Sequence, residues 1–316
     1  LERAGHPARV IRVEDRAGLH DALARIGGVD GVHLNFTDRL FGLTPRAAAE
    51  QVVDVVRHVG AAGARVTVTL HDVPQPADGG NYPQRTAAYR TVCDAVDGRA
   101  TNSEHERKLL AENGITDAAD VVVIPLPLDL GHHPTRRPVR EQREVAVLGF
   151  VYPGKGHAEV IAAMAGLAPD VGFLAIGECS AGHADLSVRL TESARAFGRT
   201  FALTGYVPNH ALSGALRQVS VPVAHHRHVS ASGSLNTWIA AHRRPLVPAN
   251  RYTEEHAGRH PETLQLYQDT KDGLATAMEA ALADPESTWL PAGAASGSPP
   301  ELTARLYVEA FARWHG

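Results

Sequence analysis

Short apolar segments that alternate with helical segments are the feature that most restricts the fold of this chain. Runs such as RVTVTL (65–70), VVVI (121–124) and VGFLAI (171–176) have the length and composition of buried strands. Between them lie amphipathic helical patterns such as residues 45–62, with a proline in the first turn and Gly63 just past the end. Strands separated by helices pair in parallel and are covered on both faces. The pattern predicts an α/β fold.

Taken in order, the pattern predicts two series of strands and helices. Strands are expected at 8–13, 31–36, 65–70 and 121–124, and then at 144–150, 171–176, 200–204, 219–224 and 245–248, and residues 263–267 form a further element near the end of the second series. Pro222 indicates that its strand is short or at an edge. Helices are expected at 19–26, 45–62, 84–96, 104–114, 157–167, 185–197, 210–218, 235–242, 273–283 and 302–314, with Ser103 and Glu106 forming a capping box and Asn209 capping another helix.

Length and composition describe a soluble, globular protein of two domains. The 316 residues can bury two cores of ordinary size, and the net charge of −4 gives no broad basic field for nucleic acid. The pair Arg243 and Arg244 is expected on a solvated face or at a small anion site. Cys93 and Cys179 make neither a disulfide framework nor a zinc site, which favours a reducing cytoplasm. The excess of Arg and Ala over Lys suggests a GC-rich, bacterial genome.

Neither a spanning helix nor a signal peptide is predicted. No run of about 18 apolar residues exists, and no basic amphipathic helix stands out as a membrane anchor, although peripheral membrane contact stays open. Residues 1–6 read like the last turn of a helix with a glycine stop, so a preceding strand, loop and most of a first helix are expected to be missing from this chain.

The segment EVAVLGFVYPGKGH (144–157) predicts an anion site. It reads as a strand, a tight turn and a helix start, where backbone N–H groups and the helix dipole both point at the turn. Lys155 adds a positive charge, so phosphate or diphosphate is the simplest ligand. The alternative is a turn lysine that binds nothing.

Other polar residues follow the strands of the second half, where ligands bind in parallel sheets. They are Gly177, the turn 205–207 and the small-residue loop 230–234, which opens a helix and also suits a phosphate. The alternative for this loop is an ordinary helix cap. Two such anion sites in one domain favour a diphosphate.

In the first half, the corresponding residues are Asn35, Thr37, Asp38, His71, Asp72, Asn102, Ser103 and the segment 125–129. His71 follows a buried strand, where an imidazole can transfer a proton or hold a sugar hydroxyl, and Asp72 can orient it or bind ligand. The alternative is a structural histidine. The cluster His225, His226 and His228 lacks cysteine or acidic neighbours, so no metal site is expected there.

These segments resemble those of GT-B glycosyltransferases, closest to the family-4-like group that uses nucleotide sugars. The resemblance covers nearly all of the chain, and five segments carry it: VLGFVYPGKGH (147–157), LTGYVPNHALSGAL (203–216), SGSLNTWIAAHRRPLV (232–247), VTLHDVP (68–74) and RATNSEHERKLL (99–110). The chain departs from the family at three positions. Phe150 stands where the family has arginine, and Ser230 and Trp238 stand where it has two glutamates.

The resemblance implies two Rossmann-like domains facing across a cleft, with the C-terminal helix crossing back to the first domain. The first, acceptor domain would comprise residues 1–135 and the terminal helix 301–316, and the second, nucleotide-sugar donor domain residues 143–290. It implies a hexosyltransferase-type enzyme (EC 2.4) that needs no metal or cofactor, retains anomeric configuration and closes its domains over the donor, a nucleotide-diphosphate sugar. The acceptor stays undefined.

The resemblance also assigns roles to residues. The catalytic residues would be His71, Asp72 and Lys155. The donor site would comprise Gly149, Lys155, Gly177, Gly205, Tyr206, Val207, Ser232, Gly233, Ser234 and Leu235. The acceptor side would comprise His33, Asn35, Asp38, Asn102 and Ser103. Two alternatives remain: a non-catalytic relative that binds a nucleotide or sugar, and an epimerase or phosphorylase-like enzyme on the same scaffold.

Overall fold

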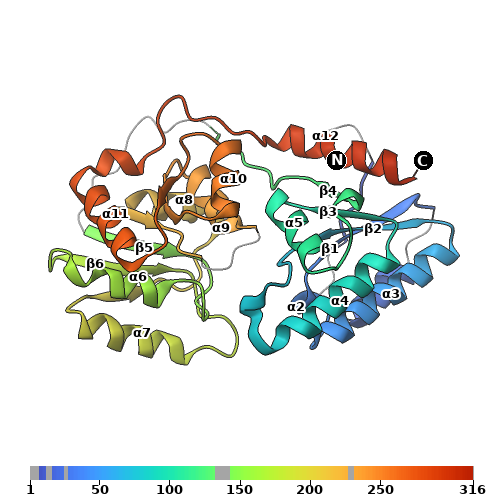
Figure 1. Cartoon of the computed structure of the whole chain (residues 1–316), viewed down its shortest axis with the longest axis horizontal. Coiled ribbons are helices and arrows are strands. Elements are labelled where there is room, and N and C mark those ends of the chain that lie inside the picture. Colours follow the sequence, from blue (N-terminus) through green and yellow to red (C-terminus); the bar gives the residue numbers. More distant parts are fainter. Residues whose placement is uncertain (1–6, 12–15, 25–27, 132–142, 227–230, 316) are drawn as a thin grey trace. The chain divides into compact units, whose positions relative to one another are not determined.

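The chain forms two compact α/β units (Figure 1). The computed structural model describes residues 7–11, 16–24, 28–131, 143–226 and 231–315. Unit 1 comprises Leu1–Pro127 together with Pro299–Gly316, and unit 2 comprises Leu128–Ser298. Every strand pair in the described residues is parallel, as the alternation of strands and helices predicts. The predicted α/β fold class is confirmed.

Unit 1 contains a four-stranded sheet in the order β1-β2-β3-β4. The strands are β1 (Gly31–Phe36), β2 (Arg65–Leu70), β3 (Gly98–Thr101) and β4 (Val121–Val123). The helices are α1 (Arg16–Ala24), α2 (Asp38–Phe41), α3 (Pro45–Ala61), α4 (Tyr82–Ala95), α5 (Glu104–Glu112) and α12 (Pro300–His315), with 3-10 turns η2 (Pro76–Asn81) and η3 (Ala118–Asp120).

Unit 2 contains a six-stranded sheet in the order β10-β9-β8-β5-β6-β7. The strands are β5 (Arg143–Leu148), β6 (Val171–Ile176), β7 (Phe201–Leu203), β8 (Val221–Val223), β9 (Leu246–Pro248) and β10 (Gln265–Tyr267). The helices are α6 (His157–Ala163), α7 (Asp185–Ala196), α8 (Asn209–Gln218), α9 (Gly233–Ala240), α10 (Arg251–Arg259) and α11 (Lys271–Ala283), with 3-10 turns η4 (Met164–Gly166) and η5 (Pro285–Thr288).

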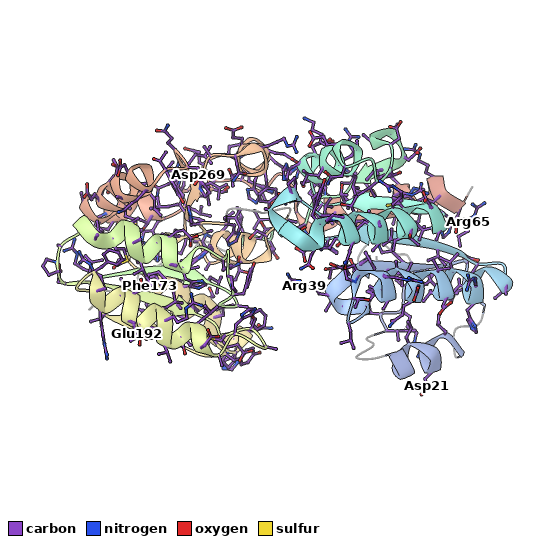
Figure 2. The ribbon with its side chains drawn as sticks, turned by 60° about the horizontal axis from the view of Figure 1, so that its bottom comes forward. Asp21, Arg39, Arg65, Phe173, Glu192 and Asp269 are labelled. Carbon is purple, nitrogen blue, oxygen red and sulfur yellow. The ribbon has the colours of Figure 1, made fainter. Side chains whose placement is uncertain are left out.

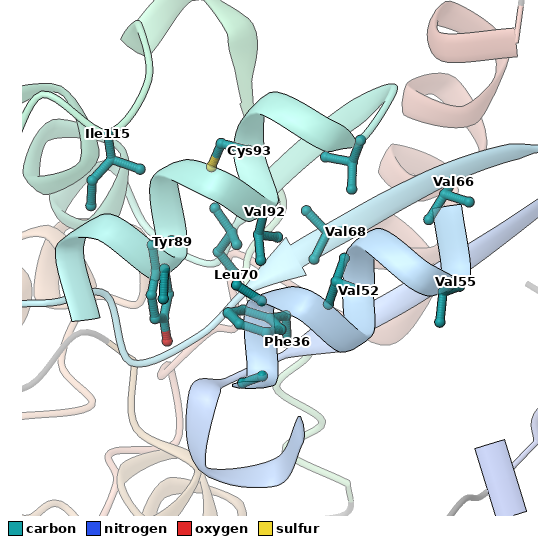
Figure 3. Packing of buried hydrophobic residues seen from close by; sticks show 14 of the residues in the cluster. Phe36, Val52, Val55, Val66, Val68, Leu70, Tyr89, Val92, Cys93 and Ile115 are labelled. Atoms are coloured by element: carbon teal, nitrogen blue, oxygen red, sulfur yellow. The ribbon is translucent and has the colours of Figure 1, made fainter. Parts of the chain in front are cut away.

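Each unit has its own hydrophobic core. In unit 1, alternate residues of β1 and β2, such as Phe36 and Val68, pack with α3 and α4 through residues such as Val52 and Tyr89 (Figure 3). In unit 2, the core between the sheet and α6, α7 and α11 contains Phe173, which Figure 2 labels. A smaller cluster with Leu216 and Trp238 covers the other face through α8 and α9. The unit 2 sheet is therefore covered on two faces.

Helix α12, at the end of the chain, packs on the face of the unit 1 sheet that α3 and α4 leave open. This confirms the prediction that the C-terminal helix crosses back to the first domain. Its Tyr307 hydroxyl lies 2.9 Å from Thr69 Oγ1 of β2. Trp314 packs over Gly98 of β3 so closely that a Cβ added at Gly98 would lie 2.3 Å from the indole ring. Ala100 and Ile124 join Trp314 in the same buried cluster. Glycine at this position therefore admits the C-terminal helix.

Replacing Gly98 with alanine is expected to destabilise unit 1 by about 1–3 kcal/mol, because the added methyl group overlaps Trp314. The matched control is Gly60→Ala on α3, where an added Cβ meets open space and is expected to stabilise by up to about 1 kcal/mol. Chemical denaturation of the two variants measures the difference. Equal stability of the variants would show that Gly98 is not needed for the packing of α12.

Several predicted elements differ from those observed. Residues 8–11 of the expected first strand are not in a strand: Val10 is 85% exposed and the edge of the described sheet is β1. Strand β8, with Pro222, is short as expected but lies centrally between β5 and β9. The sheet tolerates Pro222 because β8 pairs with β9 at a single position, Val223 with Leu246.

Other differences concern helix ends and unpredicted elements. Asn209 does not cap α8 but is its first residue, and Pro208 at the N-cap offers no side-chain hydrogen bond. The Ser103 cap of α5 is confirmed, since Ser103 Oγ accepts from the Glu106 N–H at 3.1 Å. Strand β3 and helix α10 were not predicted. Residues 1–6, 12–13, 25–26, the linker positions 132–142, Ser230 and His228 lie outside the described residues.

Arg243 is an internal residue rather than a surface one. Its side chain is fully buried over the Trp289 ring and donates hydrogen bonds to backbone carbonyls that include those of Leu216, Ser220 and Thr288. The expected solvated face or anion site is therefore wrong for Arg243, which joins α8, β8 and η5.

No helix among the described residues has the length and hydropathy needed to span a bilayer.

Candidate functional site

The turn after β5 places Lys155 at the carboxyl end of the unit 2 sheet. Gly149 follows β5 with φ +117°, and its N–H donates to the Ile176 carbonyl at 2.9 Å. A Cβ at Gly149 would lie 3.1 Å from Lys155 Nζ, so glycine here leaves room for the ammonium group. Lys155 is only 8% exposed, whereas the other two lysines of the chain, Lys108 and Lys271, are exposed. A buried lysine at a sheet edge is a strong candidate for binding an anion.

The loop before α9 meets Lys155, as the position of both segments at strand ends suggests. Lys155 Nζ donates to Ser234 Oγ at 3.1 Å, and Ser234 Oγ lies 3.2 Å from Ser232 Oγ. Ser232 is the N-cap of α9, since its hydroxyl accepts from the Leu235 N–H at 3.2 Å, and Gly233 is the first helical residue. The positive end of the α9 dipole and the Lys155 ammonium therefore point to one place.

Two histidines lie beside Lys155. Gly156, with φ +97°, brings the turn so close to the segment after β8 that a Cβ would lie 2.0 Å from the His225 carbonyl oxygen. The next residue, His226, has Nδ1 3.4 Å from Ser232 Oγ. Burial and the charge of Lys155 lower the pKa of His157 to about 4. Burial, then Lys155, His225 and His157, lower the pKa of His226 well below its ordinary value. Both imidazoles are therefore neutral near pH 7.

Sequence reasoning considered His226 only as a metal ligand and did not single out His157. The available signal was position, because His157 adjoins the Lys155 turn and His226 follows a strand end. Among the described residues, no group of three or more His, Cys, Asp or Glu side chains is arranged to hold a metal ion. His225 instead has Nδ1 2.5 Å from the Tyr267 hydroxyl.

The other predicted donor residues line the same edge of the sheet. Gly177 packs against Gly149, since a Cβ there would lie 2.4 Å from the Gly149 carbonyl oxygen, and its N–H donates to Thr204 Oγ1 at 3.0 Å. Gly177 also bridges to Gly205. Tyr206 is 69% exposed, and Val207 packs on the cluster that contains Trp238. Phe150, at the position of the family arginine, is 57% exposed.

In unit 1, His71 lies at the carboxyl end of β2. Its Nε2 lies 3.1 Å from Asn35 Oδ1 on the neighbouring strand. Burial lowers the pKa of His71, while Asp72 and a hydrogen bond with Asn102 work in the opposite direction. Asp72 is exposed and has φ +50°, a left-handed conformation that aspartate tolerates better than most residues. The structure thus brings His71, Asn35 and Asn102 together.

Arg85 of α4 holds the loop that follows β2 and contains Asp72. The sequence analysis did not single out Arg85. Its guanidinium binds the Asp38 carboxylate through two hydrogen bonds of 2.9 and 3.0 Å and donates to the Asp72 carbonyl at 2.7 Å. It also pairs with Asp78 of η2. Burial acts to lower the pKa of Arg85, but the hydrogen bond with Asp38 and the surrounding charges raise it overall. The buried Asp38 is therefore a structural partner of Arg85, and its acceptor-side role stays a prediction.

His33 and Ser103 also have structural contacts, and their acceptor-side roles stay predictions. The His33 ring nitrogens lie 2.8 Å from Thr67 Oγ1 and 2.9 Å from Thr69 Oγ1, and its ring packs edge-on against Tyr307. Burial and nearby His71 lower the pKa of His33 to about 4. Ser103 caps α5, as described above. Asn102 donates from Nδ2 to the Ile124 carbonyl at 2.9 Å, which fixes its amide beside His71.

Comparison with solved structures finds proteins of similar fold. No family model matches the chain, and no curated protein sequence matches it. Among solved structures, it is similar to Anabaena HepE in complex with UDP and glucose (TM-score 0.64, 14% identity, 84% of this chain and 72% of that one). It is also similar to sucrose-phosphate synthase from Thermosynechococcus elongatus (TM-score 0.68, 15% identity, 95% and 74%). A third is a UDP-forming trehalose-phosphate synthase from Burkholderia vietnamiensis (TM-score 0.62, 13% identity, 95% and 75%).

Proposed function

The chain has the GT-B fold, and we propose that it is a glycosyltransferase that takes a sugar from a nucleotide-diphosphate sugar. The observation that carries this proposal is the buried Lys155, whose ammonium group meets Ser234 at the start of α9. Anabaena HepE, which has the same fold, has been crystallised in complex with UDP-glucose. The diphosphate of the donor would lie at Lys155 and the first turn of α9.

This site suits stabilisation of a leaving group. When the bond between sugar and diphosphate breaks, negative charge grows on the phosphate that departs. A buried ammonium group and an aligned helix dipole stabilise that charge without reorganising at the moment of reaction. His71, with Asp72 beside it, would contact the donor sugar or the acceptor. We further propose that the reaction retains anomeric configuration and needs no metal, as in family-4-like enzymes that transfer hexoses, and that the protein acts in the bacterial cytoplasm.

A non-catalytic binder of nucleotides or sugars is the second candidate, and one observation favours it. Trp238, at the position of the second family glutamate, is fully buried among Leu216, Val219 and Ala241. Its side chain therefore belongs to the core. A protein without this carboxylate could keep the diphosphate site and lack transfer activity.

Release of free nucleoside diphosphate tests the proposal. The protein is incubated with UDP-, GDP- and dTDP-sugars and a panel of lipid, glycan and small-molecule acceptors. The proposed function predicts that one combination releases nucleoside diphosphate, and that His71→Ala reduces the rate by about 100-fold or more. The matched control is His58→Ala on an exposed part of α3. Binding of the donor without release in any combination would favour the binder instead.

A further inference from the structure

The two imidazoles beside Lys155 have polar atoms that the fold itself does not satisfy. His157 is 3% exposed, and neither of its ring nitrogens has a hydrogen-bond partner among the described residues. Nε2 of His226 is also buried without a partner there. A buried polar atom that stays unsatisfied costs about 1–3 kcal/mol, so its presence at a candidate ligand site calls for a functional explanation.

A short chain of hydroxyl groups joins His226 to Lys155. His226 Nδ1 lies 3.4 Å from Ser232 Oγ, Ser232 Oγ lies 3.2 Å from Ser234 Oγ, and Lys155 Nζ donates to Ser234 Oγ at 3.1 Å. The contact of Gly156 with the His225 carbonyl fixes the spacing of these segments. A ligand held by Lys155 and the start of α9 therefore lies within the electrostatic reach of His226.

The positive charge of Lys155 makes the protonation of His226 depend on the ligand. Lys155 and His157 face it from the turn and start of α6, and His225 precedes it after β8. With burial as the largest cause, these groups keep the pKa of His226 low and the imidazole neutral. An anion bound at Lys155 offsets the positive charge that opposes protonation, so it raises the pKa of His226.

We propose that His226 takes up a proton from solvent when a phosphorylated ligand binds at Lys155. The proton adds to the ring nitrogen that is bare in the neutral imidazole, and no covalent bond of the ligand breaks. The resulting imidazolium supplies a second positive charge in a site where Phe150 stands at the position of the family arginine. The inference rests on the proposed function for the identity of the ligand, a nucleotide-sugar diphosphate.

Calorimetry of UDP-glucose binding near pH 7, in two buffers of different ionisation enthalpy, measures the proton uptake. Each phosphate of UDP-glucose carries one ester and one anhydride bond and does not titrate near neutrality, so an uptake belongs to the protein. We expect a net uptake of protons on binding in the parent protein that is larger at pH 6 than at pH 8, with tighter binding as the pH falls. In His226→Gln the uptake disappears and affinity falls by about tenfold. His58→Gln, at an exposed position of α3, keeps both.

Nuclear magnetic resonance of the imidazole Cε1–H groups gives a second measurement on the parent protein, in case His226→Gln does not fold. A rise of the His226 titration midpoint with UDP-glucose supports the proposal. Lys155-dependent binding without proton uptake overturns it and leaves the proposed function intact. If UDP-, GDP- and dTDP-glucose all fail to bind, the proposed function fails. Sulfate, an anion that does not titrate near neutrality, then decides: an unchanged midpoint at saturating sulfate overturns proton uptake, and a raised midpoint supports it.

Discussion

Replacing Lys155 with methionine is expected to weaken the binding of UDP, or of whichever nucleoside diphosphate the parent binds, by on the order of 100-fold. A hydrogen bond to a charged group contributes about 1.5–3 kcal/mol, which corresponds to about 10–150-fold in affinity. The effect should lie at the upper end because Lys155 is buried and acts together with the start of α9. Methionine keeps the apolar stem of the side chain and removes the ammonium group, with its charge and its hydrogen-bond donors.

The other two lysines of the chain provide the controls for this substitution. Lys108→Met and Lys271→Met each remove one positive charge at an exposed position, and neither should change affinity by more than about twofold. Isothermal titration calorimetry of the three variants makes the comparison. If Lys155→Met binds the nucleotide as tightly as the two controls, the donor site lies elsewhere.

Replacing Arg85 with methionine is expected to destabilise unit 1 by about 3–5 kcal/mol. The substitution leaves the Asp38 carboxylate, only 6% exposed in its side chain, without its buried partner, and breaking such a pair from one side has a cost of this size. It also removes the shorter of two hydrogen bonds to the Asp72 carbonyl and leaves that of the Tyr89 hydroxyl at 3.2 Å, in a loop with a left-handed residue. The loop that follows His71 should therefore lose its conformation.

Two further variants separate the ion pair from a general effect of losing an arginine. Arg46→Met removes an arginine whose side chain is 90% exposed in its pair with Glu50, and it should change stability by no more than about 0.5 kcal/mol. The double substitution Arg85→Met with Asp38→Leu should recover part of the loss, because it removes the unpaired charge. Urea unfolding measures all three variants. A loss in Arg85→Met no larger than that in Arg46→Met would show that this cluster does not hold the loop.

The fold could be predicted because its signals are local. The strands 65–70 and 171–176 match β2 and β6 residue for residue, since each is a run of buried residues bounded by turn signals. Strand β3 escaped because Gly98–Thr101 contains a glycine and an arginine and has no apolar pattern. Its place in the sheet depends on long-range partners, which are β2, β4 and the Trp314 ring.

The candidate site was predictable only in part, for a similar reason. Lys155 and Ser234 were expected at strand ends, and parallel topology brings such ends to one edge. The roles of Arg85 and His33 depend on partners that are distant in sequence. Arg85 binds Asp38, 47 residues before it, and His33 contacts Thr69, 36 residues after it. No spacing rule along one helix or strand identifies such pairs. The sequence therefore does not distinguish a strand histidine that is held by threonines, as His33 is, from one that binds a ligand.

A structure of the protein with the nucleoside diphosphate that it binds would test whether Lys155 and the start of α9 form the donor site. We predict phosphate oxygens within hydrogen-bond distance of Lys155 Nζ and of Ser234 or the first backbone N–H groups of α9. We also predict the loss of that density in Lys155→Met under the same conditions. A nucleotide bound away from both Lys155 and the start of α9 would contradict the proposed donor site.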